Sequence, residues 1–205
     1  MQTSTSMKRN LRLSTVDGGR NLRKQRTIIV LGVDPGTLVT GFGVIARREA
    51  DMRLLGCGTI KNGSQESMPL RLKHIYSELQ SLIDRYHPDE FAIESAFYGK
   101  NAQSALKLGH ARGVSILAAV KNEIPTSEYS PREVKKAVVG KGTASKEQVQ
   151  FMVKSLLDLT DGRMLLDTSD ALAIAICHLH RLTTPMSKHN DWKSFIAAHP
   201  ERVKK

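Results

Sequence analysis

Three strand-like apolar segments in succession constrain the fold of this 205-residue chain more than any other feature. Thr27 to Val33 (TIIVLGV) is a continuous, β-branched run that stops at the turn sequence Asp34-Pro35-Gly36. Gly41 to Ala46 and Met52 to Ile60 predict the next two strands. The chain therefore opens with a predicted three-stranded meander.

Helix and strand patterns alternate after the meander. Pro69 to Tyr86 carries apolar residues three and four positions apart, which predicts an amphipathic helix lying on the sheet. Glu90 to Glu94 predicts a fourth strand, Gln103 to Lys121 a second helix, and Ser127 to Tyr129 a fifth strand. Later helices are predicted from Pro131, from about Lys146 behind a Ser145 and Gln148 capping box, and from Thr168 to Arg181. This order predicts an α/β fold.

The helix predicted over Gln103 to Lys121 is apolar on nearly all sides. Gly109, Ala111 and Gly113 leave room on it for close backbone approach. A helix of this kind must be covered on two sides. The sheet provides one cover, and either a second subunit or the rest of the fold provides the other.

The formal net charge of +11 is concentrated at the two ends of the chain. Residues 1 to 26 hold seven Lys and Arg against one acid, and residues 185 to 205 hold five against two. We predict a disordered basic extension over 1 to 26, with an organellar transit peptide as the alternative, one domain over 27 to 184, and a polar basic tail over 185 to 205. So basic a chain attracts polyanions, and nucleic acid is the commonest of these.

The two cysteines, Cys57 and Cys177, lie far apart and form no C-x-x-C spacing. They support neither a disulfide framework nor a zinc site, so a reducing, cytoplasmic location is predicted. No apolar run approaches the roughly 20 residues of a membrane span, and no signal-peptide hydrophobic region lies near the start.

Four acidic residues stand at the ends of predicted elements: Asp34, Glu94, Asp167 and Asp170. Converging carboxylates would bind Mg²⁺ through hard oxygen ligands. Each acid also has a plainer interpretation. Asp34 can serve its turn, Glu94 can form a salt bridge or lie at a partly exposed strand end, and Asp167 and Asp170 can cap a helix.

Four long segments resemble the RuvC family of bacterial Holliday-junction resolvases and together cover residues 28 to 181. They are VLGVDPGTLVTGFGVI, FAIESAFYGKNAQSALKLGHARG, EYSPREVKKAVVGKGTASKEQVQFMV and DTSDALAIAICH. The resemblance implies an RNase H-like fold with a mixed five-stranded sheet flanked by helices. It also implies a metal-dependent endodeoxyribonuclease that resolves four-way DNA junctions by paired symmetric nicks in recombination and repair.

The same resemblance assigns the active site. It implies that Asp34, Glu94, Asp167 and Asp170 bind two Mg²⁺ ions, with Mn²⁺ as a substitute, and that hydrolysis leaves 5′-phosphate and 3′-hydroxyl ends. Lys146 and Lys135 match family residues near the scissile phosphate, and Lys146 also starts a helix whose free amides favour phosphate. The predicted DNA-binding strip continues through Arg132, Lys136 and Lys141.

The resemblance has further implications for DNA contact and for partners. Phe97 resembles an aromatic residue that stacks on an unpaired base near the junction centre. A homodimer would match the two strands that are cut, and RuvA and RuvB would be partners.

His178 and His180, two positions apart on a helix, point to different faces and are predicted to be structural, with His178 nearer the site.

Three other classes of function share some of these sequence features. An actin-like ATPase or sugar kinase also carries Asp-x-Gly-Thr after a strand, but such chains usually need two domains. A junction-binding scaffold without catalysis is disfavoured because all four acids are present. Chemistry alone leaves open an RNase H-like nuclease that acts on flaps or on RNA–DNA hybrids.

Overall fold

The computed structural model describes residues 26–95, 102–159 and 165–183. Its elements in chain order are β1 (Ile28–Asp34), β2 (Val39–Arg48), β3 (Asp51–Lys61), α1 (Met68–Tyr86), β4 (Glu90–Glu94), α2 (Ala102–Lys121), β5 (Thr126–Tyr129), α3 (Pro131–Val139), α4 (Lys146–Leu156) and α5 (Leu166–Thr183). Every predicted element is present. The last helix begins two residues earlier than predicted, which places Asp167 inside its first turn.

The five strands form one mixed sheet in the order β3-β2-β1-β4-β5. The first three strands pair antiparallel as the predicted meander. β4 and β5 extend the sheet from β1 in parallel. The predicted α/β fold, with a mixed five-stranded sheet flanked by helices, is confirmed.

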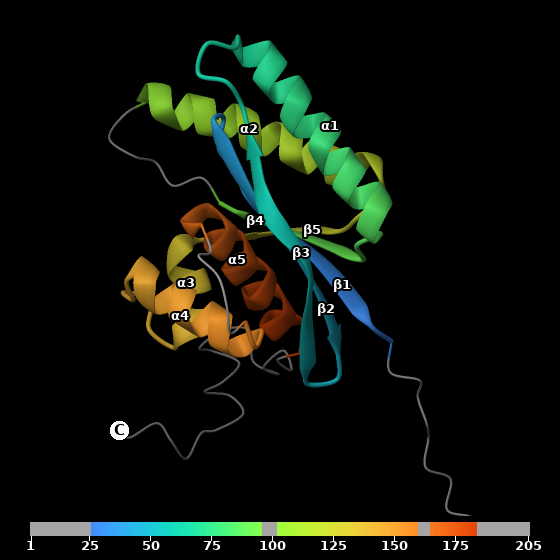
Figure 1. The fold of residues 1–205 in the computed structure, drawn as a ribbon, viewed down its shortest axis with the longest axis vertical. Helices are drawn as coiled ribbons and strands as arrows, with labels where there is room; N and C mark the ends of the chain where they lie inside the picture. The colour runs from blue at the N-terminus through green and yellow to red at the C-terminus, as the bar shows by residue number, and fades with distance from the viewer. Residues whose placement is uncertain (1–25, 96–101, 160–164, 184–205) are drawn as a thin grey trace, which may run out of the picture.

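Helices cover both faces of the sheet (Figure 1). One face packs on α1 and α2 through an apolar core that includes Leu31, Ile75 and Phe91. The other packs on α5, with α3 and α4 outside it, through a second core that includes Leu172 and Val153. α5 is thus enclosed between the sheet and two further helices.

Glycines allow α5 to approach the sheet backbone. A Cβ added at Gly32 on β1 would lie 2.8 Å from the backbone nitrogen of Ala175, and one added at Gly43 on β2 would lie 2.8 Å from Cγ of Leu172. Such contacts are closer than real side chains tolerate. The glycines therefore determine how closely α5 packs against the sheet. That distance in turn determines where the acids at the start of α5 lie relative to the strands.

Two further expectations are addressed by the described residues. Cys57 and Cys177 are both free thiols. No helix of the described segments combines the length and the apolarity needed to cross a membrane. Most of the basic extension and of the polar tail predicted at the two ends lies outside the described residues.

Candidate active site

Asp34 and Glu94 lie side by side at one edge of the sheet. They directly follow Val33 and Ile93, which are paired in the parallel register of β1 and β4. Side chains two positions apart on a strand share a face, and Gly32 faces α5. Asp34 therefore also points to the α5 side of the sheet, and the carboxyl ends of two neighbouring strands supply two acids at one level.

Partly buried hydrogen bonds stabilise the turn after Asp34. The hydroxyl of Thr40, which is fully buried, donates to the carbonyl of Gly36 at 2.6 Å and accepts from its amide at 3.3 Å. The side-chain amide of Asn62 donates to the carbonyl of Thr37 at 2.9 Å. Neither Thr40 nor Asn62 was predicted from the sequence to support the site, because neither contact follows from local spacing alone.

The start of α5 brings the second pair of acids to the same edge. Gly41, which pairs with Asp34 in the sheet, would place an added Cβ 2.7 Å from the carbonyl carbon of Asp167. Asp170 lies one helical turn further on and accepts a 2.7 Å hydrogen bond from Nζ of Lys146 at the start of α4. Side chains from four separate elements, β1, β4, α4 and α5, thus meet at this edge of the sheet.

Crowding of negative charge changes the protonation of this cluster. Burial, together with the charges of Glu94 and Asp170, raises the pKa of Asp34 to about 8. Burial also raises the pKa of Glu94, which shares a hydrogen bond with Asp34. The hydrogen bond to Asp170 raises the pKa of Lys146. Without a metal, the two strand-end acids therefore retain a proton that a bound cation would displace.

A cavity of about 260 Å³ opens at these residues. Its polar lining consists of Asp34, Glu94, Lys135, Lys146 and Asp170, and its apolar walls consist of Pro131, Val134, Val149, Ala173 and Ile174. The polar lining contains five of the residues that the sequence analysis predicted for the site. The apolar walls were missed because they follow from how α3 and α4 pack on α5.

The donor set fits a hard divalent cation. Carboxylate oxygens without histidine or thiolate partners are typical ligands of Mg²⁺. Over residues 26–95, 102–159 and 165–183, no three His, Cys, Asp or Glu side chains already lie close enough together to hold an ion. Lys146 instead neutralises Asp170. Binding of metal would thus require Asp170 to exchange its ammonium partner for the ion.

The other predicted DNA-binding residues are less tightly gathered. Lys136 lines a second cavity, of about 540 Å³, on the other flank of α3. Arg132 is exposed and packs against Gly142, and Lys141 is exposed in the loop between α3 and α4. Phe97 lies outside the described residues.

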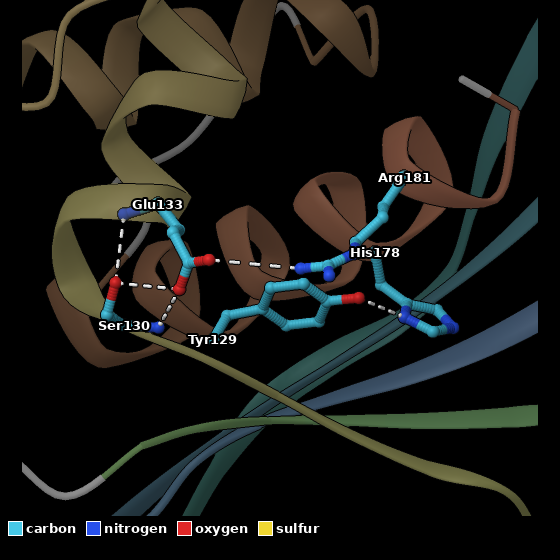
Figure 2. A network of polar contacts seen from close by, with 5 residues as sticks. All are labelled: Tyr129, Ser130, Glu133, His178 and Arg181. Atoms are coloured by element: carbon cyan, nitrogen blue, oxygen red, sulfur yellow. Dashed lines mark hydrogen bonds and ion pairs between the residues drawn. The ribbon is translucent and has the colours of Figure 1, made fainter. Parts of the chain in front are cut away.

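The two histidines of α5 do contact different elements. His178 is 2% exposed, and its Nδ1 lies 2.7 Å from the hydroxyl of Tyr129 (Figure 2). Nδ1 of His180 lies 3.1 Å from the carbonyl of Ala137. Neither histidine lines the acidic cavity.

Known proteins match the chain across this whole region. The family described as crossover junction endodeoxyribonuclease RuvC matches residues 30–178. The RuvC of Chloroherpeton thalassium is 48% identical over 186 residues, which cover 87% of this chain and 100% of that protein. The RuvC of Photobacterium profundum is 53% identical over 152 residues, which cover 74% of this chain and 87% of that protein.

Solved structures agree with the sequence matches. The structure of Thermus thermophilus RuvC with a Holliday junction substrate has a TM-score of 0.71 at 33% identity, and the match covers 76% of this chain and 94% of that chain. The yeast mitochondrial Holliday junction resolvase Ydc2 has a TM-score of 0.53 at 15% identity, a likeness of fold alone. The predicted RNase H-like fold is confirmed. The breadth of these matches shows that this chain belongs to the RuvC family of crossover junction endodeoxyribonucleases.

Proposed function

We propose that this protein is a metal-dependent endodeoxyribonuclease that resolves four-way DNA junctions by paired symmetric nicks in homologous recombination and repair. The observation that carries the proposal is the convergence of Asp34, Glu94 and Asp170 on one cavity in a chain of the RuvC family. The Thermus relative was solved with a junction bound, which supports the same substrate here.

The four acids, Asp34, Glu94, Asp167 and Asp170, would hold two Mg²⁺ ions, with Mn²⁺ as a substitute. Bound ions of this kind activate a water and stabilise the departing 3′ oxygen, which leaves 5′-phosphate and 3′-hydroxyl ends. Asp34 and Glu94, whose pKa values are raised in the metal-free protein, would give up their shared proton to solvent when they hold the ions. The paired strand ends keep their carboxylates at a fixed separation during this step.

Lys146 and Lys135 would act on the DNA. Both line the cavity, from the start of α4 and from α3. The ammonium of Lys146 leaves Asp170 and turns to the phosphate, where it offsets charge that develops in the transition state. Lys135 holds the adjoining backbone, with Arg132, Lys136 and Lys141 further out and Phe97 stacking on an unpaired base.

A second copy of the chain would cover α2. Leu106, Leu117 and Val120 are 61%, 56% and 57% exposed on this helix. Gly109 and Gly113 lie on the same side, and an added Cβ at either would meet no atom within 4 Å. Leu106, Gly113 and Val120 are spaced seven residues apart, as on a helix that packs along a partner helix. Two copies joined here would present two active sites to the two strands of a junction.

We place the protein in the cytoplasm, with the RuvA and RuvB branch-migration complex as its partners. We also propose that basic residues 1–26 raise nonspecific affinity for DNA. Removing residues 1–26 should make the salt dependence of duplex binding less steep. An unchanged dependence would exclude this role.

Cleavage of a synthetic four-way junction tests the proposed function. Linear duplex, flap and RNA–DNA hybrid substrates of matched sequence serve as substrate controls, and Asp84→Asn, which changes an exposed acid on α1, serves as the protein control. We expect the parent and Asp84→Asn to make paired nicks with Mg²⁺ and none with EDTA, and Asp34→Asn to bind the junction without cutting it. Cleavage of the control substrates alone would assign another substrate, and junction binding without cleavage by the parent would indicate a scaffold.

A further inference from the structure

A buried hydrogen bond connects the end of β5, just before α3, to α5, and the carboxylate of Glu90 on β4 lies beside it. Tyr129, the last residue of β5, is 3% exposed, and its hydroxyl lies 2.7 Å from Nδ1 of His178. The two rings meet edge to face, with centroids 5.7 Å apart. On the far side of the imidazole, Nε2 lies 3.5 Å from a carboxylate oxygen of Glu90.

The protonation of His178 follows from its surroundings. Burial and the charge of Arg181 lower the pKa of His178, so the ring is neutral. A neutral imidazole has one donor and one acceptor nitrogen. With the proton on Nε2, that N–H faces Glu90, while Nδ1 accepts a hydrogen bond from the hydroxyl of Tyr129. Nε2 makes no hydrogen bond among the described residues, so the hydrogen-bonded link joins β5 to α5 and ends beside Glu90.

Position in the chain gives this link its significance. Glu90 begins the strand that ends in Glu94, and α3 begins two residues after Tyr129. Ser130 caps α3 through a reciprocal capping box with Glu133, so the direction of the helix is set at its first turn (Figure 2). Lys135, which lies two residues after Glu133 on the same helix, lines the catalytic cavity.

Further along its length, α3 is held to α5 at the carbonyl of Ala137, which lies 3.1 Å from Nδ1 of His180. It has nine residues, and Val134 and Val138 are its buried side chains. One flank lines the catalytic cavity through Pro131, Val134 and Lys135, and the other lines the second cavity through Glu133, Lys136 and Ala137. A short helix between two hollows can tilt at small cost unless its start is fixed.

A second contact between α3 and α5 lies at the surface and is weaker. Glu133 and Arg181 are 3.8 Å apart, with side chains 54% and 68% exposed. Exposed ion pairs of this type contribute little. The buried hydrogen bond of the Tyr129 hydroxyl is therefore the stronger of these two side-chain contacts near the start of α3, and it acts beside the 2.8 Å backbone hydrogen bond from the Ser95 amide to the Tyr129 carbonyl.

We propose that Tyr129 and His178 are positioning residues for DNA cleavage, because their buried hydrogen bond fixes the start of α3 and so holds Lys135 in the catalytic cavity. The proposal rests on the nuclease function proposed above. It concerns how fast a bound junction is cut and leaves junction affinity unchanged.

Tyr129→Phe tests the proposal most directly, since it removes one hydroxyl and keeps the ring. Single-turnover cleavage at saturating protein should be about tenfold slower, because small displacements of catalytic groups are costly. The Kd for the junction in EDTA should stay within about twofold, since Lys135 is one of several phosphate contacts and the others remain. Tyr86→Phe, at the end of α1 on the other face of the sheet, is the matched control and should cut at the parent rate.

Two further variants separate positioning from a general folding defect. His178→Asn keeps an amide near the place of Nδ1 and should retain more activity than His178→Leu. In a Lys135→Ala background, Tyr129→Phe should cause little further loss, because both changes act through the same ammonium.

The outcomes distinguish the two proposals. A parent protein that fails to cut junctions contradicts the proposed function itself. If the parent cuts and Tyr129→Phe cuts equally fast, or if its loss is undiminished without Lys135, the positioning role is wrong. Should Tyr129→Phe not fold, the same comparison is made between His178→Asn and His178→Leu, and equal rates for these two would overturn the proposal.

Discussion

α5 and α2 are both long and rich in apolar residues, yet they differ in how much of their surface is covered. Eleven of the 18 residues of α5 are buried, against four of the 20 residues of α2. α5 lies between the sheet and the pair α3 and α4. α2 packs on α1 and the sheet and leaves Leu106, Leu117 and Val120 exposed.

The difference separates two roles that apolar helices serve. A helix enclosed by its own chain is a rigid base, and α5 carries Asp167 and Asp170 at its start. A helix with an exposed apolar side is typical of an association surface. We interpret α5 as the support of one active site and α2 as the surface that brings two such sites together.

The largest expected effect comes from the start of α5. Asp170→Asn should lower junction cleavage about 1000-fold or more, because a proposed metal ligand and the partner of Lys146 are lost together. Glu123→Gln, which changes an exposed acid just after α2, should stay within about twofold of the parent. Single-turnover rates in Mg²⁺ measure both. Equal rates for Asp170→Asn and the parent would remove this acid from the site.

A matched pair of glycine substitutions compares the packing of the two helices. Gly32→Ala should destabilise the fold by about 3 kcal/mol, because its Cβ would meet the backbone of α5. Gly109→Ala on α2 meets no atom within 4 Å and should stabilise the isolated chain by up to about 1 kcal/mol. Urea unfolding at low protein concentration measures both changes. Similar losses for the two variants would contradict the contrast between the helices.

A charged residue on the open side of α2 should separate the subunits. Leu117→Glu should weaken dimerisation about 100-fold, because it would place a carboxylate in an apolar interface. The fold should persist, since Leu117 is 56% exposed. Sedimentation equilibrium gives the dimerisation constant, and circular dichroism is the control for folding. Undiminished dimerisation would place the interface elsewhere.

The smallest expected effect is on the stability of the metal-free protein. Asp34→Asn should raise the free energy of unfolding by about 1 to 2 kcal/mol in EDTA at neutral pH, because it removes a buried acid whose raised pKa obliges it to take up a proton on folding. Mg²⁺ should then raise the Tm of the parent and leave that of Asp34→Asn nearly unchanged. Thermal unfolding with and without the metal tests this. A variant less stable than the parent in EDTA would argue against this raised pKa.

Local patterns predicted most of the fold. Period and turn residues placed all five strands and five helices, because each element presents an apolar face of its own period. The predicted start of α5 was two residues too late. In the structure, the hydrogen bonding of this helix begins with the Ser169 amide and the Leu165 carbonyl, ahead of the apolar pattern. Asp167 therefore lies in the first turn, where an acid also suits the helix dipole.

Contacts between distant segments were not predictable in the same way. Lys146 and Asp170 are 24 residues apart, and Tyr129 and His178 are 49 apart, so both contacts depend on how helices pack. Its apolar composition indicated that α2 must be covered on two sides. Composition could not decide whether the second side packs on the rest of the same chain or on a second copy of the protein. The described residues leave one side of α2 exposed, which favours the second copy.

Cutting of a cruciform on a supercoiled plasmid tests the central claim, that α2 joins two active sites which act on one junction. Two cuts within the life of one complex give linear DNA, whereas a single cut relaxes the plasmid and gives a nicked circle. At concentrations where the parent is dimeric and Leu117→Glu is monomeric, we predict linear product from the parent and nicked circles from the variant. Linear product from the monomeric variant at the parent rate would contradict the account.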